Sequence, residues 1–567
     1  MRNLSSKDLI FLSTALILFV FRFWLGREIG VFIMAESYHD DFLMIRYAHL
    51  REHFVMQELP YNLSLVKDMG FPFFLKFVDL SGISYIDWLT FSWLIAAVIM
   101  TWLFVLVTNV KDRRIWLLVY AFVLFMPVAF SFVGRRIYRQ AFLSPLYFIT
   151  LEMMTILFVF YWNNLKISFT KLALFNIFLG GVFTITFYVK EDGVWLLMCL
   201  LAALLCSLIK NFLHDKNLKK KFIHAIIIFI PLAIFASGTV LYKSINEKFF
   251  GVYLINNRTE GELGQFLKNV YKTKSDERTS KIWAPTDVII KFFDTSETLR
   301  NNEKLRYRVL HTTWYQGDII KNPIQGDFLS WVMMTELLES DTCHSAIEQE
   351  LFLKLVNAEI DAAFEKGILQ KDDKFQLVSS MGGYSFEEIL ELKTLIFQIY
   401  KTHLLMDAYE IHLERDKVMN PSGNDRTVDV AAKEKFHDEI KRISKFINVD
   451  LISEDTNYQS RQVIAAYIFK IYYVLNSALF VAAIISIFNL KNFSQEILQY
   501  MIVVGFLLLS LIYALAVAWF SNFIGISGVV YYSNGIVPMI TMFEIFGTYR
   551  LFVCVKRSKF ISKFNPN

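Results

Sequence analysis

Long apolar runs separated by short polar connectors dominate both ends of this chain. A helix needs about 20 mostly apolar residues to cross the hydrocarbon layer, because its backbone polar groups must be satisfied within the segment. The pattern therefore predicts an all-α polytopic membrane protein with about ten transmembrane helices. The runs lie at residues 9–25, 88–110, 115–133, 141–162, 172–189, 194–209, 222–242, 463–488, 497–520 and 528–555.

A long polar block divides the apolar runs into two groups. Residues 1–242 are predicted to form an N-terminal transmembrane module of about seven helices, and residues 462–567 a C-terminal module of about three. The block between them, residues 243–461, is long enough to fold as a domain of its own. Helix-like periodicity at residues 349–413 predicts that this external soluble domain is mainly helical.

The distribution of Lys and Arg in the short connectors predicts the orientation. Most of these charges lie in connectors that share one side of the membrane, including residues 111–114, 210–221 and 556–563. Cytoplasmic loops carry an excess of Lys and Arg, so this side is predicted to be cytoplasmic. Both termini are then cytoplasmic, whereas the first loop, residues 26–87, and the block at residues 243–461 are external.

The composition agrees with a multi-pass membrane protein and excludes several other classes. Hydrophobic residues make up 55% of the 567 residues, charged residues 20%, and the mean hydropathy is +0.41. The net charge of +5 lies in connectors and forms no stripe suited to nucleic acid, so we predict no nucleic-acid partner. The sequence has no P-loop, no Rossmann fingerprint and no His-Glu-x-x-His zinc motif. The lipid bilayer is the first predicted partner.

Two adjacent carboxylates, Asp40 and Asp41, follow the first apolar run directly after His39. Carboxylates beside a bilayer repel each other and resist desolvation unless a cation, a donor or a proton compensates them. One could deprotonate an acceptor hydroxyl as general base, while the other orients it or helps to bind a divalent cation, Mg²⁺ or Mn²⁺. His39 is a candidate substrate-binding residue. The alternative is that both carboxylates cap a helix beginning near Phe42.

Three arginines, Arg135, Arg136 and Arg139, lie on the side of the membrane that should be poor in them. Guanidinium groups bind phosphate oxygens in bidentate fashion, so these residues are predicted to hold a donor phosphate and to stabilise the leaving group. Two alternatives remain: the side chains extend to lipid head groups, or the local topology is inverted.

The next external turn carries Lys190, Glu191 and Asp192. An acidic pair with a lysine beside it could complete the same site as a substrate-binding element. The alternative is a solvated turn whose carboxylates favour the start of the following helix.

The acidic pair beyond the first span, the long loop after it, and the run from Gly70 to Leu75 before the second span resemble the GT-C superfamily of polytopic membrane glycosyltransferases. The resemblance covers the N-terminal module and the many-helix layout. It implies an inverting hexosyl- or pentosyltransferase that uses a polyprenyl-phosphate-linked sugar, with Asp40 or Asp41 as the base. The resemblance does not identify the acceptor, and we predict a hydroxyl of a cell-envelope glycan or glycolipid from the bacterial character of the composition.

Two other classes of function fit a many-helix protein. A lipid or polysaccharide flippase is one, but the sequence shows no matching half-repeats, and its charged motifs cluster in external loops rather than at mid-membrane. A non-catalytic envelope assembly protein is the other, and it would tolerate loss of the carboxylates. The four cysteines and the Phe-, Ile- and Lys-rich composition favour a bacterial plasma membrane.

Overall fold

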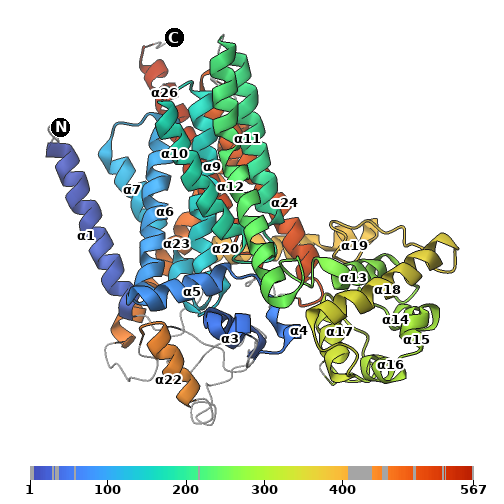
Figure 1. The fold of residues 1–567 in the computed structure, drawn as a ribbon. Coiled ribbons are helices and arrows are strands. Elements are labelled where there is room, and N and C mark those ends of the chain that lie inside the picture. The colour runs from blue at the N-terminus through green and yellow to red at the C-terminus, as the bar shows by residue number, and fades with distance from the viewer. Residues whose placement is uncertain are drawn as a thin grey trace.

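The computed structural model describes residues 6–28, 31, 38–55, 59–165, 167–214, 217–313, 315–406, 437–449, 458–489, 493–525, 529 and 532–564. Within these ranges the regular structure is helical, and β-structure is limited to isolated bridges such as Phe375 with Tyr384. Nine of the described helices are long and apolar enough to cross a membrane, and they stand side by side as a bundle (Figure 1). They are α1 (Ser6–Glu28), α6 (Tyr85–Thr108), α9 (Arg139–Trp162), α10 (Phe169–Phe187), α11 (Val194–His214), α12 (Leu218–Phe250), α23 (Tyr458–Phe488), α24 (Phe493–Ser521) and α26 (Ile536–Phe564).

The prediction of one continuous span at residues 115–133 is wrong. Helix α7 (Arg113–Leu124) is only 12 residues long, and the 3₁₀ turn η2 (Pro127–Phe130) and the short helix α8 (Phe132–Arg135) follow it. Met126 has the extended backbone that a following proline favours, and Pro127 has no N–H to continue a helix. Apolar composition does not register such a break, so the described chain has nine helices of spanning length where the sequence predicts about ten.

Polar caps fix where the spans begin and end. The Ser84 hydroxyl accepts a hydrogen bond from the Asp87 backbone N–H at 3.1 Å at the start of α6, and Asn109 ends that helix with φ 53°. Helix α12 is 33 residues long and therefore extends beyond its apolar run. It ends before Gly251, where φ is 75°. Figure 1 shows the start of α1 and the end of α26 at the same, upper end of the bundle.

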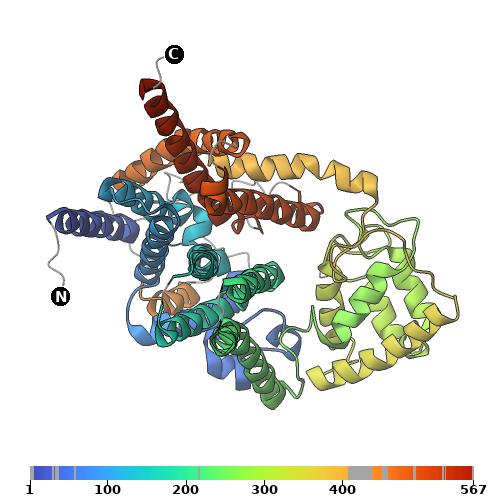
Figure 2. The ribbon, with the colours of Figure 1, turned by 90° about the horizontal axis from the view of Figure 1, so that it is seen from above.

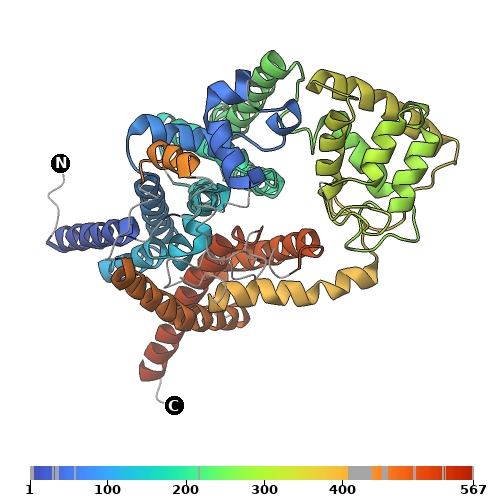
Figure 3. The same ribbon diagram turned by 90° about the horizontal axis from the view of Figure 1, so that it is seen from below.

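The first loop folds into short helices across the lower end of the bundle, as Figure 3 shows from below. The amide of Gly70 donates to the carbonyl of Tyr188, in the turn between α10 and α11, at 2.7 Å. A Cβ atom at Gly70 would lie 2.3 Å from that carbonyl oxygen, so only glycine allows this approach. The short elements are η1 (Tyr38–Phe42), α2 (Leu43–Ala48), α3 (Leu50–Val55), α4 (Tyr61–Ser64) and α5 (Gly70–Ser81).

We expect Gly70→Ala to lower the free energy of unfolding by about 1–3 kcal/mol, because the added methyl group forces two backbone segments apart. Gly181→Ala is the matched control, since a Cβ atom there meets no other atom within 4 Å. Thermal unfolding of both variants in detergent measures the difference. Equal unfolding midpoints would show that the loop does not depend on this contact.

The polar block lies beside the bundle (Figure 2), level with its lower end in Figure 1, and its first helix begins at Gly261. It contacts the first loop, where the amide of Asn257 donates to the carbonyl of Leu65 at 2.9 Å. It also contacts the end of α24, where the Tyr384 hydroxyl donates to the carbonyl of Trp519 at 2.8 Å. Its helices are α13 (Gly261–Lys272), α14 (Thr286–Thr295), α15 (Glu297–Arg300), α16 (Glu303–Leu310), α17 (Phe328–Glu339), α18 (Ala346–Glu365) and α19 (Phe386–Glu391).

The last described part of residues 243–461 returns to the bundle. Helix α20 (Lys393–Leu405) lies against α23 and α24, and the Tyr400 hydroxyl is 2.6 Å from the Ser510 hydroxyl of α24. Helix α22 (His437–Phe446) lies near the first loop, where the carbonyl of Ile447 accepts from the Tyr85 amide at 3.0 Å. These contacts place α20 and α22 on the bundle, and α19 continues from the helical block directly into α20.

Candidate functional site

Asp40 and Asp41 lie in a single π-helical turn, η1, immediately before α2. The residue at the N-cap position of α2 is Phe42, and the structure shows no side-chain hydrogen bond that caps this helix. Both carboxylates lie in the first turn of the helical segment that continues into α2, so the alternative that they favour a helix start stays open. The Asp41 side chain has no exposed surface, whereas Asp40 keeps 38% of its side chain exposed. Only Asp40 is open to a substrate.

Arg136 neutralises Asp41 inside the protein. Its Nε atom lies 2.9 and 3.0 Å from the two carboxylate oxygens of Asp41, and its Nη2 atom lies 2.6 Å from Oδ1. Both side chains are buried. A buried carboxylate needs such a partner because its charge is otherwise costly to remove from water. This pair joins the first loop to the segment before α9.

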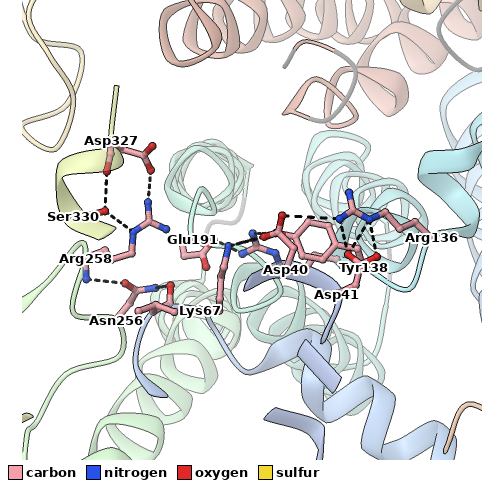
Figure 4. Close-up of polar contacts among 12 residues, drawn as sticks. Asp40, Asp41, Lys67, Arg136, Tyr138, Glu191, Asn256, Arg258, Asp327 and Ser330 are labelled. Atoms are coloured by element: carbon pink, nitrogen blue, oxygen red, sulfur yellow. Dashed lines mark hydrogen bonds and ion pairs between the residues drawn. The ribbon is translucent and has the colours of Figure 1, made fainter. Parts of the chain in front are cut away.

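Asp40 lies among two cations and a phenol (Figure 4). Its Oδ1 atom accepts from the Tyr138 hydroxyl at 2.8 Å and from Lys67 Nζ at 3.2 Å, and Arg136 Nη2 is 3.9 Å from Oδ2. Burial alone would raise the pKa of Asp40, but the charges of Lys67, Arg136 and Arg139 outweigh it and hold this pKa well below its usual range. Asp40 is therefore ionised at neutral pH.

Arg139 connects Asp40 to the second acidic element. Its Nη2 atom donates to the Tyr138 hydroxyl at 2.6 Å, and its Nη1 atom is paired with Glu191. Burial would raise the pKa of Glu191, but Arg139 and then Lys67 lower it to about 2. Arg139 Nε and Glu191 Oε1 are buried and have no hydrogen-bond partner within the described chain. Both atoms are thus available to a ligand.

The remaining predicted site residues are distributed around this centre. Lys190 pairs with Asp192, and its Nζ atom lies 4.9 Å from the ring centre of Tyr532. Arg135 turns the other way and donates to the carbonyl of Gly26 near the end of α1. The structure thus directs Arg135 toward α1, and the prediction that Arg135, Arg136 and Arg139 act as one phosphate-binding group stays a prediction. The side chain of His39 lies outside the part of the chain that the structure describes.

Sequence reasoning missed several residues that complete the site. Three of them are Lys67, Asp68 and Tyr138, which lie in short segments flanked by apolar residues. A charged or phenolic group between apolar residues was the only sequence feature that could have indicated a role in the site. Asn256 Nδ2 donates to the carbonyl of Val66 at 3.1 Å and to Asp68 Oδ1 at 3.3 Å. These contacts bring the segment after α12 to the site, which the sequence could not indicate because the partners are almost 200 positions apart.

The polar block covers one side of the site through Arg258 and Trp331. Arg258 is paired with Asp327, and its Nε atom donates to the Ser330 hydroxyl at 3.0 Å (Figure 4). The ring of Trp331 is buried, with Lys67 Nζ 5.4 Å and the Arg258 guanidinium 5.0 Å from its centre. Cations over an aromatic face are attracted by its quadrupole. Trp331 therefore holds the two cations in place and does not present a free face to a sugar.

Asp68 makes the stability of the protein depend on pH. Its burial, followed by the nearby charge of Glu191, raises the pKa of Asp68 well above its ordinary value of 3.8. A pKa raised by folding adds stability at low pH that is lost as the pH rises through the folded-state pKa. We expect the temperature of the unfolding midpoint to decrease as the pH rises above the ordinary pKa of 3.8, and to decrease less in Asp68→Asn. The control Asp79→Asn, at a partly exposed carboxylate, should keep the full dependence, and identical profiles for all three proteins would contradict this assignment.

The site offers few protein ligands to the predicted divalent cation. Across the described ranges, no group of three His, Cys, Asp or Glu side chains is arranged to hold a metal ion. Asp40 and Glu191 are both partnered by cationic side chains. Mg²⁺ is often held by one or two carboxylates and completed by phosphate oxygens of a substrate. Because both carboxylates are paired with cationic side chains, a shared site of that kind stays a prediction.

The site thus combines one accessible carboxylate with four basic side chains, Lys67, Arg136, Arg139 and Arg258, at the end of the helix bundle. Its residues come from the first loop, the segment before α9, the turn between α10 and α11, and the polar block (Figure 4). Comparisons of this chain with protein-family models, with curated proteins and with solved structures gave no match.

Proposed function

We propose that this protein is a membrane glycosyltransferase that moves a sugar from a polyprenyl-phosphate donor to a hydroxyl acceptor. The observation that carries the proposal is the contrast between the two carboxylates. Asp41 is buried against Arg136, whereas Asp40 is partly exposed among Lys67, Arg136 and Tyr138. An accessible carboxylate beside basic groups provides a proton acceptor and a phosphate-binding surface together.

The donor phosphate would compete with carboxylates for the same cations. Lys67 and Arg139 are paired with Asp40 and Glu191 in the structure. A phosphate that attracts these two cations weakens their hold on Asp40, and the pKa of Asp40 rises toward a value suited to a base. Binding of the donor would thus activate the base. Without the donor, Asp40 would be too weak a base to deprotonate the acceptor hydroxyl.

The proposed step is a direct displacement. Asp40 takes the proton of the acceptor hydroxyl as its oxygen bonds to the anomeric carbon. The bond from that carbon to the phosphate oxygen breaks, and the polyprenyl phosphate leaves with its negative charge stabilised by Lys67 and Arg139. Attack opposite to the leaving group inverts the anomeric centre. The donor's lipid chain stays in the bilayer and enters between helices, in a bacterial plasma membrane with the termini cytoplasmic and the site external.

Lys67 is expected to contribute to donor binding. A charge-assisted hydrogen bond to phosphate is worth about 1.5–3 kcal/mol, so Lys67→Met should raise KM for the donor by about ten-fold or more. The control is Lys76→Met, which removes a lysine of the same loop that pairs with Asp79. Initial rates over a series of donor concentrations measure both effects. A normal KM in Lys67→Met would remove this residue from the phosphate site.

The function is tested with the purified full-length protein in lipid vesicles and a panel of radiolabelled polyprenyl-phosphate sugars. Transfer predicts that label leaves the lipid and appears on a glycan or glycolipid acceptor. A flippase would move the intact lipid-linked sugar between leaflets without breaking it, and an assembly protein would do neither. Chelator treatment followed by addition of Mg²⁺ or Mn²⁺ shows whether a divalent cation is required. Failure to cleave any donor in the panel with envelope acceptors present would contradict the proposal.

A further inference from the structure

Helices α19 and α20 share one exposed apolar stripe, formed by Phe386, Leu390 and Phe397. Each of these side chains is more than half exposed in the structure. Leu392, between the two helices, keeps helical backbone angles of φ −63° and ψ −15°, so the helices continue in nearly the same register. At about 100° per residue, the three side chains fall within about 40° of one another. The stripe is thus one continuous face.

The face of α20 opposite the stripe carries its buried residues Ile399, Thr402 and His403, and Tyr400, about 60° from the stripe, contacts membrane-spanning helices. The Tyr400 hydroxyl is 2.6 Å from the hydroxyl of Ser510 in α24, and the Tyr400 ring centre is 6.1 Å from that of Phe480 in α23. Ser510 precedes Ser521, the last residue of its span, by eleven residues. At 1.5 Å per residue, this contact lies about 16 Å along α24 from its end. Tyr400 therefore contacts α24 within its membrane-spanning part.

The beginning of α19 lies at the end of the same span. The Tyr384 ring stacks on the Trp519 ring with centres 4.2 Å apart, and the exposed Phe375 ring lies 5.9 Å from it. Trp and Tyr are enriched where a membrane meets water, because their rings are apolar and their N–H and O–H groups are polar. Figures 2 and 3, which look along the bundle, show α19 and α20 lengthwise, so the two helices run across the bundle and lie close to this boundary.

We propose that α19 and α20 form a helical segment embedded in one leaflet, with Phe386, Leu390 and Phe397 in contact with lipid. The occupant of the stripe is lipid rather than protein because α20 packs on α24 at Ser510, and the adjacent side chains Leu511 and Ile512 are exposed apolar groups of a membrane-spanning helix. Lys393 lies on the exposed side between Leu390 and Phe397. Its long stem can cover apolar surface while its ammonium group reaches the lipid head groups. This inference is independent of the proposed transfer reaction.

The experiment compares lipid exposure at the stripe with exposure elsewhere in the full-length chain. The four native cysteines are first replaced by serine, and Phe386→Cys, Phe397→Cys or Tyr307→Cys is then labelled with a fluorophore. Tyr307 is equally exposed but belongs to α16, at the lower end of the polar block and away from the bundle (Figure 1). The proteins are placed in phosphatidylcholine vesicles, with doxyl-labelled phosphatidylcholine as the lipid quencher and iodide on both sides as the aqueous quencher.

Doxyl lipid should quench the label in Phe386→Cys and Phe397→Cys several-fold more strongly than in Tyr307→Cys, and iodide should show the reverse order. Equal access of iodide to all three positions would overturn the proposal. Protection from both quenchers would also overturn it, because a second copy of the chain or another protein would then cover the stripe. The two stripe variants probe different helices, so misfolding of one leaves the other as a valid test.

Discussion

Replacement of Asp40 by asparagine is expected to reduce the rate of sugar transfer by about 10²- to 10⁴-fold, the usual contribution of a positioned general base. Asparagine has nearly the same size as aspartate, and its carbonyl oxygen can still accept the hydrogen bond from Tyr138 at this position. What it lacks is the negative charge and the ability to take a proton. Single-turnover transfer from a radiolabelled donor measures the loss in the chemical step directly.

Two comparisons make this result specific. Asp79→Asn removes a partly exposed carboxylate from the same loop and should retain full transfer, because Asp79 pairs only with Lys76 in the described chain. The thermal unfolding midpoint of Asp40→Asn should fall at neutral pH, because the cations that lower the pKa of Asp40 stabilise its charged form and the buried Lys67 loses this partner. Full transfer by Asp40→Asn would eliminate Asp40 as the base. Equal loss in both variants would point to a general disturbance of the loop.

Breaking the Arg136–Asp41 pair should have the largest effect on stability. Removing one partner of a buried ion pair leaves an uncompensated charge and costs about 3–5 kcal/mol. Arg136→Met leaves the fully buried Asp41 carboxylate without its bidentate partner. We expect a strongly lowered unfolding midpoint in detergent and loss of transfer, since the same guanidinium lies 3.9 Å from Asp40.

The double variant Asp41→Asn with Arg136→Met tests the pairing itself. It should be less destabilised than the sum of the two single variants, because neither charge then remains unpaired. Lys304 and Asp341 form an exposed pair on the polar block and serve as the control. Exposed ion pairs contribute about 0–1 kcal/mol, so Lys304→Met should change stability little. If the losses of unfolding free energy in the two single variants add up to the loss in the double variant, Arg136 and Asp41 do not stabilise the protein through their interaction.

The spanning helices could be predicted from the sequence because crossing a bilayer imposes a length and an apolar composition that can be read residue by residue. The break after α7 could not be read in the same way. The run at residues 115–133 is apolar throughout its break, and only Pro127 and Gly134 indicate that the backbone turns there. A Cβ atom at Gly134 would lie 1.9 Å from the carbonyl oxygen of Val128, which explains the glycine in this turn.

The candidate site was predictable in its residue types but not in its pairing. The adjacent carboxylates and the arginines before α9 were both evident, yet their sequence separation of 95 residues does not reveal that Arg136 meets Asp41. Neighbouring arginines also diverge, because Arg135 closes a short helix and faces α1, whereas Arg136 follows it. The contribution of Asn256 and Arg258 depends on how the polar block is seated, which is a property of the folded chain alone.

The seating of the polar block limits how it can move. It is continuous with α12 at Gly251, contacts the first loop through Asn257 and meets the end of α24 through Tyr384. A domain attached by one linker can swing as a hinged cover, but a body fastened at three places cannot rotate without breaking one of them. We therefore expect the block to stay in place as one side of the site. A substrate must then reach Asp40 without a movement of the block.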